Sequence, residues 1–379
     1  MLTGAMLSAC GGGGDSPQAV PTAADRIAIG DRLFDETTLS ASGRLACATC
    51  HVESRAHADA AGSFLPLGGV NGDQQGLRST PTLRYLSDNR AFRFNPNGDP
   101  AGGFTWDGRA DSRAAQARLP LLAAHEMANG DEASVARRLR ALPYLAQLLF
   151  AFSLPTGASD TQLVAAAAQA LADYQAGDAK FQPYTSKFDA ALEGRAALSA
   201  QEARGLALFN DPQRGNCAVC HTSTPPPGAS KPLFTNFTYH ALGVPRNASH
   251  ATRDAGFFDL GLCGPRRSDL SDLAALCGMF RVPTLRNVAL TAPYFHNGAI
   301  ATLEDAVAFY ATRDSDAARW YPVVGGLVQR FDDLPPVYRA NVSFEAPFNL
   351  RAGAPPALST QDMQDIVAFL NTLTDGYSP

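Results

Sequence analysis

The feature that most constrains this chain is a five-residue pattern, Cys-x-x-Cys-His, that occurs once in each half. Two thiols at this spacing can form thioethers with the vinyl groups of one haem, and the histidine that follows can ligate the iron. A single copy is also compatible with half a zinc site or with a redox dithiol. Two complete copies instead predict two covalently bound haem c groups, attached at Cys47, Cys50 and His51 and at Cys217, Cys220 and His221.

The length and composition are those of an ordinary folded protein with two domains. The chain has 379 residues, of which 45% are hydrophobic and 18% are charged, and one domain typically holds ~100–200 residues. The formal net charge of −5 gives none of the basic character of nucleic-acid-binding proteins. No apolar run approaches the ~20 residues that a membrane-spanning helix needs. We therefore exclude a disordered or fibrous chain and expect no nucleic-acid partner.

Each haem motif ends a similar stretch of sequence. The stretches 24–51 and 198–221 both carry apolar residues at helical spacing, then a Leu-Phe pair, a polar turn and the motif. In the second stretch, Ser199 and Glu202 form a capping-box pattern that predicts the start of a helix. This internal repeat of a cytochrome c opening helix predicts two haem domains.

Two further segments predict the helices that close the domains. Residues 161–178 are rich in alanine, which has the highest helix propensity, and residues 358–373 carry apolar residues at every third or fourth position. No strand pattern of any length appears, so the predicted class is all-α, with two cytochrome c-like haem domains at 21–185 and 186–379. Long connecting loops are predicted in the Gly- and Pro-rich stretches 62–76, 95–103 and 222–232.

Residues 1–20 resemble the remnant of an export signal followed by a flexible tether. Leu7, Ser8, Ala9 and Cys10 match a bacterial lipoprotein cleavage box, and four glycines follow them. No lysine or arginine precedes the box, so the signal is incomplete, and a free cysteine in a disordered start is the alternative. Because haem c attachment implies export in either case, we expect a periplasmic protein with a lipid anchor at Cys10.

Two cysteines, Cys263 and Cys277, lie outside both haem motifs and the cleavage box. In an oxidising compartment they are expected to pair as a disulfide that closes a short loop. Such a loop closure contributes ~3 kcal/mol to stability. Two buried free thiols are the alternative.

On these motifs, the sequence resembles the bacterial di-haem cytochrome c peroxidase and MauG superfamily. The likeness spans roughly residues 25–375 and is carried by the paired opening helices and by two further segments, 104–127 and 280–310. The resemblance implies a hydrogen-peroxide-dependent oxidoreductase with two haem c groups. Its electrons would come from a periplasmic redox protein or from a side chain of a protein substrate.

The resemblance assigns roles to four residues of the first segment. Trp106 corresponds to the tryptophan that lies between the two haems, where an indole carries electrons from one to the other. Glu126 and Gln116 correspond to residues above the first haem, and Pro120 to a residue that shapes this pocket. A carboxylate there can take a proton from one peroxide oxygen and give it to the leaving one.

The first haem iron, with His51 as its proximal ligand, is expected to be open to peroxide. Ordinary members of the superfamily carry a second histidine about sixteen residues downstream that caps this iron in the resting enzyme. Here residues 63–80 contain no histidine, and His57 is too near to His51 to reach the opposite face of the haem. MauG-like members share this absence.

The distal ligand of the second haem divides the superfamily. Peroxidases place a methionine fourteen residues after the histidine of a Pro-Tyr-Phe-His stretch, which here is His296, and that count leads to Tyr310. MauG-like members also have tyrosine there, and a phenolate ligand lowers the reduction potential whereas methionine raises it. The alternative is that Tyr310 is a core aromatic residue and that Met279 ligates instead. His296 itself is expected to hydrogen-bond near a haem propionate.

The superfamily also holds a calcium ion between the haems, bound by an asparagine side chain and two backbone carbonyls. The carbonyl positions correspond to Thr291 and Pro293, and the asparagine position to Ser79, whose hydroxyl is a weaker ligand for a hard cation.

MauG has a surface tryptophan that draws electrons from its protein substrate, but Gly215 stands at that position here and Trp320 lies far away in sequence. Maturation of methylamine dehydrogenase is therefore not supported, and the electron route must differ.

Three functions follow from these observations. The first is a MauG-like enzyme that stores oxidising equivalents over both haems and then oxidises a redox partner or a protein side chain. The second is a cytochrome c peroxidase that lost its gating histidine and takes electrons from a small cytochrome or cupredoxin. The third is an electron carrier with two closed haems, against which Glu126 argues because a carrier needs no acid–base group over its iron. The sequence does not indicate the oligomeric state.

Overall fold

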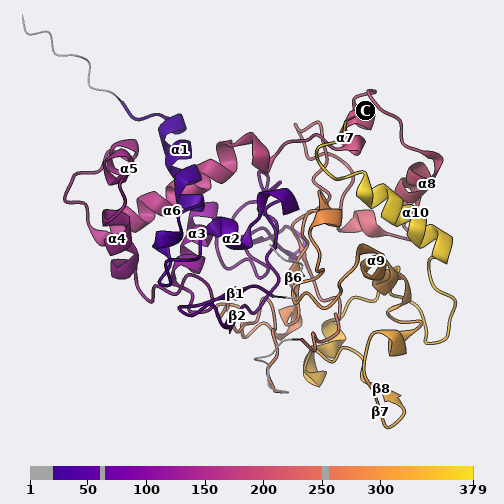
Figure 1. Cartoon of the computed structure of the whole chain (residues 1–379). Helices are drawn as coiled ribbons and strands as arrows, with labels where there is room; N and C mark the ends of the chain where they lie inside the picture. Colours follow the sequence, from indigo (N-terminus) through magenta and orange to yellow (C-terminus); the bar gives the residue numbers. More distant parts are fainter. Residues whose placement is uncertain (1–19, 60–64, 250–255, 379) are drawn as a thin grey trace, which may run out of the picture.

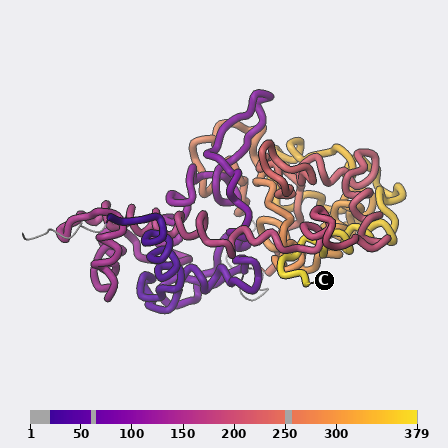
Figure 2. Tube along the Cα trace, turned by 90° about the horizontal axis from the view of Figure 1, so that it is seen from above, coloured from indigo at the N-terminus to yellow at the C-terminus, as the bar shows by residue number. Residues whose placement is uncertain are grey.

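The computed structural model describes residues 20–59, 65–249 and 256–378, which form two helical lobes that lie side by side (Figures 1 and 2). The α-helices are α1 (Ala23–Phe34), α2 (Cys47–Cys50), α3 (Arg113–Leu122), α4 (Glu132–Arg140), α5 (Leu145–Ala151), α6 (Asp160–Gly177), α7 (Lys187–Leu192), α8 (Ala200–Asn210), α9 (Leu303–Thr312) and α10 (Thr360–Asn371). The 3-10 helices are η1 (Thr37–Leu39), η2 (Glu53–Arg55), η3 (Ala179–Phe181), η4 (Cys217–Val219), η5 (Ala274–Leu276), η6 (Val288–Leu290), η7 (Ala317–Arg319) and η8 (Pro336–Asn341).

In each lobe the helix before the haem motif crosses the helix that closes the lobe, α1 against α6 and α8 against α10. Both crossings need a glycine. A Cβ on Gly30 would lie 2.1 Å from the carbonyl oxygen of Ala170, and one on Gly205 would lie 1.9 Å from that of Asp365. Because no side chain fits at these distances, the two glycines let the helix backbones touch. The predicted repeat of a cytochrome c opening helix is therefore also a repeat in structure, since each opening helix crosses its closing helix at a glycine.

The predicted closing helices are confirmed, since α6 and α10 occupy the segments 161–178 and 358–373 to within two residues at each end. The predicted capping box is also confirmed: Ser199 Oγ accepts from the backbone N–H of Glu202 at 3.2 Å, and Glu202 Oε2 accepts from that of Ser199 at 2.6 Å. Reciprocal caps of this kind satisfy two helix-end donors at once. Equivalent boxes begin α1, α6 and α10.

The strands in the described residues are four antiparallel ladders of two residues each, so the all-α prediction is confirmed. They pair β1 (Leu67–Gly68) with β2 (Gln74–Gln75), β3 (Arg93–Phe94) with β4 (Pro100–Ala101), β5 (Tyr239–His240) with β6 (Phe280–Arg281), and β7 (Val323–Val324) with β8 (Leu327–Val328). Most of these ladders pin long loops rather than build a sheet. The β5–β6 ladder matters most for function because it lies beside both candidate haem sites.

Each lobe has its own hydrophobic core, and a third cluster lies where the lobes meet. The third cluster combines Tyr85 and Phe104 of the N-terminal half with Leu233 and Phe237 of the C-terminal half. Ion pairs reinforce the junction, including Arg78 with Asp259 at 2.7 Å, where both side chains are almost fully buried. A buried ion pair favours one relative placement of its two elements because displacement would leave charges unpaired.

The predicted disulfide between Cys263 and Cys277 is confirmed. It closes a loop of the C-terminal half that reaches back to the N-terminal half, where Arg267 donates to the backbone carbonyl of Asp107 at 3.0 Å. Among the described residues, no helix is both long and apolar enough to cross a membrane. The predicted lipid anchor at Cys10 lies outside the described residues.

Candidate active site

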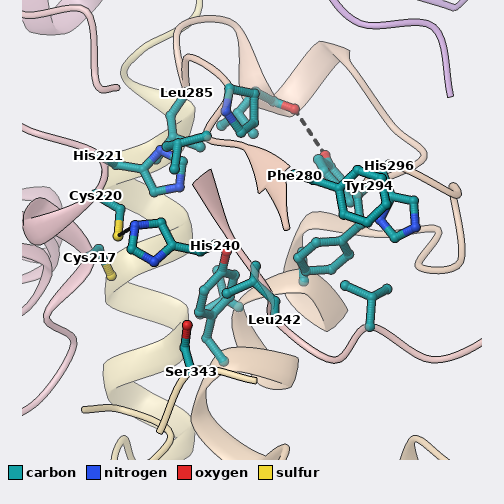
Figure 3. A pocket seen from close by; sticks show the side chains of 18 of the residues that line it. Cys217, Cys220, His221, His240, Leu242, Phe280, Leu285, Tyr294, His296 and Ser343 are labelled. Atoms are coloured by element: carbon teal, nitrogen blue, oxygen red, sulfur yellow. Dashed lines mark hydrogen bonds between the residues drawn. The ribbon is translucent and has the colours of Figure 1, made fainter. Parts of the chain in front are cut away.

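Two cavities contain the two cysteine–histidine motifs, and we call them the N-terminal and the C-terminal cavity. The N-terminal cavity is lined by Cys47, Cys50 and His51, and its opposite walls come from α3 and the turn after it. The C-terminal cavity is lined by the second motif and by α9, and Figure 3 shows its cysteine sulfur atoms beside the imidazole of His240, with that of His221 on the same side of the cavity.

Both motif histidines are oriented by a backbone carbonyl. The Nδ1 atom of His51 lies 2.8 Å from the carbonyl oxygen of His57, and that of His221 lies 3.0 Å from the carbonyl oxygen of Phe234. Because a carbonyl only accepts, Nδ1 carries the proton and Nε2 is left available to a metal. Burial lowers the pKa of each imidazole to about 4, so both are neutral at ordinary pH, as an iron ligand must be.

The four motif cysteines are free thiols rather than disulfides. Burial raises the pKa of Cys47 and Cys217 to about 12 and that of Cys50 and Cys220 to about 11. Burial of a thiolate is costly, whereas a thioether to haem is uncharged and suits such a site. The donor set in both cavities therefore fits a covalently attached haem c.

His57 does not line the N-terminal cavity, as predicted from its closeness to His51. Its ring is buried, lies 4.3 Å from the ring of Phe181 in a stacked arrangement, and accepts from Arg84 Nε at 3.2 Å. The backbone at His57 is left-handed, with a φ of 56°, which turns its carbonyl toward His51. The role of His57 is thus to support the proximal histidine from behind.

The three residues predicted above the first haem all line the N-terminal cavity. Gln116 and Pro120 lie on α3, and Glu126 lies in the turn that follows this helix. Burial raises the pKa of Glu126, while the guanidinium groups of Arg109 and Arg266 act in the opposite direction. A carboxyl group with a raised pKa can both accept and return a proton near neutral pH.

Sequence reasoning missed three other residues of this pocket: His125, Arg109 and Arg266. The Nη2 atom of Arg266 lies 2.9 Å from His125 Nε2, and that Nε2 lies 3.6 Å from Glu126 Oε1. Arg266 belongs to the disulfide-closed loop of the other half of the chain. No local motif signals this contact, because it exists only once the two lobes have docked.

Tyr310 lies on α9 and lines the C-terminal cavity together with His221. Its pKa is raised, mainly by burial and also by the nearby Cys220 and Cys217 thiols, so the phenol gives up its proton only against a cation. Met279, the predicted alternative ligand, packs in another cluster, and no methionine is among the described residues that line this cavity.

Two further histidines line the C-terminal cavity, and Figure 3 shows them on different sides of it. His240, which sequence reasoning missed, lies on β5 with its Nε2 atom 3.3 Å from Cys220 Sγ. His296 is buried and stacks on Phe280 with ring centroids 3.6 Å apart. The stacking holds the His296 ring flat against Phe280 at the edge of the C-terminal cavity.

Trp106 lies in the wall that the two cavities share. Its indole N–H donates to the backbone carbonyl of Ser79 at 2.8 Å. A short set of residues lines both cavities: Ser79, Thr80, Pro81, Thr82, Trp106 and Arg281. A π-system in this position faces both candidate haem sites.

The residues predicted to bind calcium meet at the same wall. The hydroxyl of Ser79 lies 3.5 Å from the backbone carbonyl oxygen of Pro293, and Thr291 lines the same cavity. In the described part of the chain, no group of three or more His, Cys, Asp or Glu side chains is arranged to hold a metal ion. A cation here would therefore depend on carbonyl and hydroxyl oxygens.

Trp320 packs against α9, the helix that carries Tyr310, although it is distant from the haem motifs in sequence. Its ring lies 5.5 Å from that of Phe309, the residue before Tyr310, and its N–H donates to Thr312 Oγ1 at 2.9 Å.

Gly215 lines the C-terminal cavity, and a Cβ there would lie 2.3 Å from the backbone oxygen of Leu208. The backbone at Gly215 thus leaves no room for a tryptophan.

The chain is similar to known proteins over most of its length. A family model described as di-haem cytochrome c peroxidase matches residues 24–197. The methylamine utilization protein MauG of Paracoccus denitrificans is 37% identical over 372 residues, which cover 96% of this chain and 92% of that protein. The cytochrome c551 peroxidase of Nitrosomonas europaea is 32% identical over 288 residues, covering 76% of this chain and 73% of that protein.

A solved structure is similar over nearly the whole chain. The diheme peroxidase BthA of Burkholderia thailandensis superposes with a TM-score of 0.85 and 39% sequence identity, covering 94% of this chain and 87% of that one. The superposed part of this chain thus spans both lobes, and it includes both cysteine–histidine motifs. The chain belongs to the di-haem cytochrome c peroxidase family and is a hydrogen-peroxide-dependent oxidoreductase with two haem c groups.

Proposed function

We propose that this protein is a MauG-like member of the family, in which peroxide reacts in the N-terminal cavity and the C-terminal haem is ligated by His221 and Tyr310. The observation that carries the proposal is the difference between the two cavities. One holds Glu126 near a single proximal histidine, and the other holds a buried tyrosine and no methionine among the described lining residues. We assign the reaction with peroxide to the first cavity because Glu126 lies opposite its motif histidine, whereas Tyr310 occupies the corresponding role in the second.

Cys47, Cys50 and His51 would hold a haem in the N-terminal cavity, and that haem would supply the iron chemistry that cleaves the O–O bond of hydrogen peroxide. Glu126 takes a proton from the oxygen that stays and returns it to the oxygen that leaves as water. His125 lies 3.6 Å from the Glu126 carboxyl and contacts Arg266, whose charge acts on Glu126, while Gln116 and Pro120 line the same cavity. Removal of two electrons from the enzyme then balances the reduction of the peroxide.

Trp106, which lines both cavities, would carry oxidising equivalents between them, and Tyr310 would ligate the second haem together with His221. A phenolate ligand favours higher oxidation states of iron, whereas a methionine ligand favours the reduced state. The electrons that restore the resting enzyme come from a periplasmic redox protein or from a protein side chain. Calcium bound at Ser79, Thr291 and Pro293 and a lipid anchor at Cys10 belong to the same proposal.

A conventional cytochrome c peroxidase is the second candidate, and the similarity to the Nitrosomonas europaea enzyme favours it. Steady-state assays separate the two. We expect the ferric protein to react rapidly with one equivalent of peroxide but to turn over slowly with small cytochrome or cupredoxin donors. Rapid multiple turnovers with such donors would assign the conventional peroxidase function instead.

A further inference from the structure

One wall of the C-terminal cavity is a layer of aromatic rings that continues outward through the lobe. Phe295, Tyr310 and Phe348 line the cavity, and Phe309 packs behind them with its ring centroid 5.2, 6.2 and 6.4 Å from theirs. Trp320 is the next ring, since its centroid lies 5.5 Å from that of Phe309. The rings thus form a continuous series of contacts from the cavity wall to Trp320.

Trp320 is the outermost ring of this series. It is half-buried, whereas Phe309 is fully buried. Arg319 directly before it and Pro322 two residues after it are both exposed. A protein that contacts this segment can therefore reach the edge of the indole, but it cannot reach Phe309 or the rings that line the cavity.

The hydrogen bond of the indole suits the loss of an electron. Its N–H donates to Thr312 Oγ1 at 2.9 Å, and the Thr312 hydroxyl donates to the carbonyl of Ala308 at 2.7 Å. Because the hydroxyl proton is directed at Ala308, a lone pair of the Thr312 oxygen faces the indole. A neutral acceptor of this kind stabilises the positive charge of an oxidised indole while the indole keeps its proton.

One charged side chain faces the indole. The guanidinium of Arg319 lies 4.5 Å from the centre of the Trp320 ring and pairs with Asp305 at 2.8 Å. A cation over an aromatic ring is attracted by the electrons of that ring, so it makes removal of one of them harder. Arg319 therefore offers a way to change the reduction potential of the indole without changing the ring itself.

We propose that Trp320 is the redox-active residue through which electrons enter the C-terminal haem. The inference needs the family's reaction with peroxide and the haem at Cys217 and Cys220, and it holds whichever residue ligates that iron. Hydrogen peroxide takes two electrons and two protons and becomes two water molecules. The Trp320 indole gives up one electron at a time through Phe309, and a one-electron donor protein returns each electron to the indole.

The test is peptide mapping by mass spectrometry of the ferric holoenzyme after treatment with hydrogen peroxide in the absence of a donor. An indole that loses two electrons takes up the oxygen of one water molecule, releases two protons and becomes hydroxytryptophan. We expect one added oxygen atom on Trp320, and less of this product when ferrocyanide supplies the electrons. Cyanide, which competes with peroxide for haem iron, should abolish the modification. The chain has two tryptophans, so the peptides of Trp320 and Trp106 are easily told apart.

Three variants separate a redox role of Trp320 from a structural one. W320F keeps an aromatic ring against Phe309, but phenylalanine is much harder to oxidise, so the optical spectrum formed with peroxide should decay several-fold more slowly than in wild type. R319Q removes the nearby charge and should raise the yield of modified Trp320. Y377F is the matched control and should behave as wild type, because Tyr377 is exposed and is not among the described residues that line the two cavities.

Absence of added oxygen on Trp320 in the wild type would overturn the proposal. An equal amount in the cyanide-treated sample would also overturn it, because peroxide would then attack the indole directly, and so would decay at the wild-type rate in W320F. If W320F fails to fold, peptide mapping of the wild type and R319Q still decides the question. An axial ligand other than Tyr310 would change the spectrum of the resting enzyme but none of these outcomes, so failure of the proposed function is distinguishable from failure of this inference.

Discussion

The indole N–H of Trp106 donates to the backbone carbonyl of Ser79 at 2.8 Å, and this bond sets the ring in the wall between the two cavities. Ser79 is in turn bound to the other half of the chain, because its backbone N–H donates to the carbonyl of His296 at 2.8 Å. The bridging ring thus depends on contacts from both lobes, and its position reports whether the lobes are correctly docked.

Substitution of Trp106 tests its hydrogen bond to Ser79 and its role in electron transfer between the haems. W106F keeps an aromatic side chain but removes the donor to Ser79 and the easily oxidised indole. We expect a loss of about 1–3 kcal/mol in the free energy of unfolding, because a partly buried carbonyl loses its partner, and slower electron exchange between the haems. Chemical denaturation and rapid-mixing spectroscopy measure the two effects. Unchanged electron exchange would show that electrons do not pass through Trp106.

Glu126 predicts a pH dependence for the reaction with peroxide. Since its pKa is raised above the ordinary value of 4.5, the basic carboxylate form is lost as the pH falls through that raised value. The rate constant for peroxide should therefore decline toward acid with a midpoint above 4.5. E126Q should lower the rate constant about 10²-fold or more and abolish this dependence.

A substitution of Arg266 tests the same pH dependence, because it changes the charge near Glu126 and leaves Glu126 itself in place. Its positive charge lowers the pKa of Glu126, so R266Q should move the acid midpoint to higher pH while the rate at alkaline pH stays close to wild type. Stopped-flow rates across the pH range measure the midpoint. A profile that is identical in wild type and R266Q would remove Arg266 from the account of the pocket.

The helix crossings predict an effect of single methyl groups on stability. G30A and G205A each place a Cβ about 2 Å from a backbone oxygen of the crossing helix, so the helices must separate. We expect each variant to lose about 1–3 kcal/mol of unfolding free energy. G157A is the control, because a Cβ on Gly157 meets no atom within 4 Å. Equal stability of all three variants would contradict the packing described for the lobes.

The parts of this structure that the sequence predicted are those controlled by local pattern. Capping residues, the alanine-rich helix and the two haem motifs each act within a few turns of chain. The repeat also held an overlooked signal: Gly30 and Phe34 have the same spacing as Gly205 and Phe209, and in both lobes the glycine meets the crossing helix. That shared spacing could have predicted how the opening helices pack.

Two contacts that sequence analysis did not predict form only when the chain folds back on itself. Arg266 reaches the peroxide pocket from a disulfide-closed loop of the other half, and Trp320 reaches Phe309 through the fold of the C-terminal lobe. Such contacts depend on how loops return to the lobes, for which periodicity carries no information. The domain boundary near residue 185 and the roles of the site residues remain predictions of the motifs.

Substitutions of Tyr310 test whether this residue ligates the second haem and sets its midpoint potential. Y310M should raise the midpoint potential of that haem, because methionine stabilises the reduced iron relative to a phenolate. Y310F should leave the position without a ligand. Redox titration and optical spectra of the holoenzyme check both variants. Identical potentials in wild type and Y310M would show that Tyr310 does not ligate the iron.

The central claim, one open haem beside one closed by a tyrosine, is tested most directly by the electron paramagnetic resonance spectrum of the resting ferric holoenzyme. The account predicts one high-spin haem, which disappears on addition of one equivalent of peroxide, and one low-spin haem that is lost in Y310F. Two low-spin haems in the resting enzyme, or a second haem unaffected by Y310F, would contradict it.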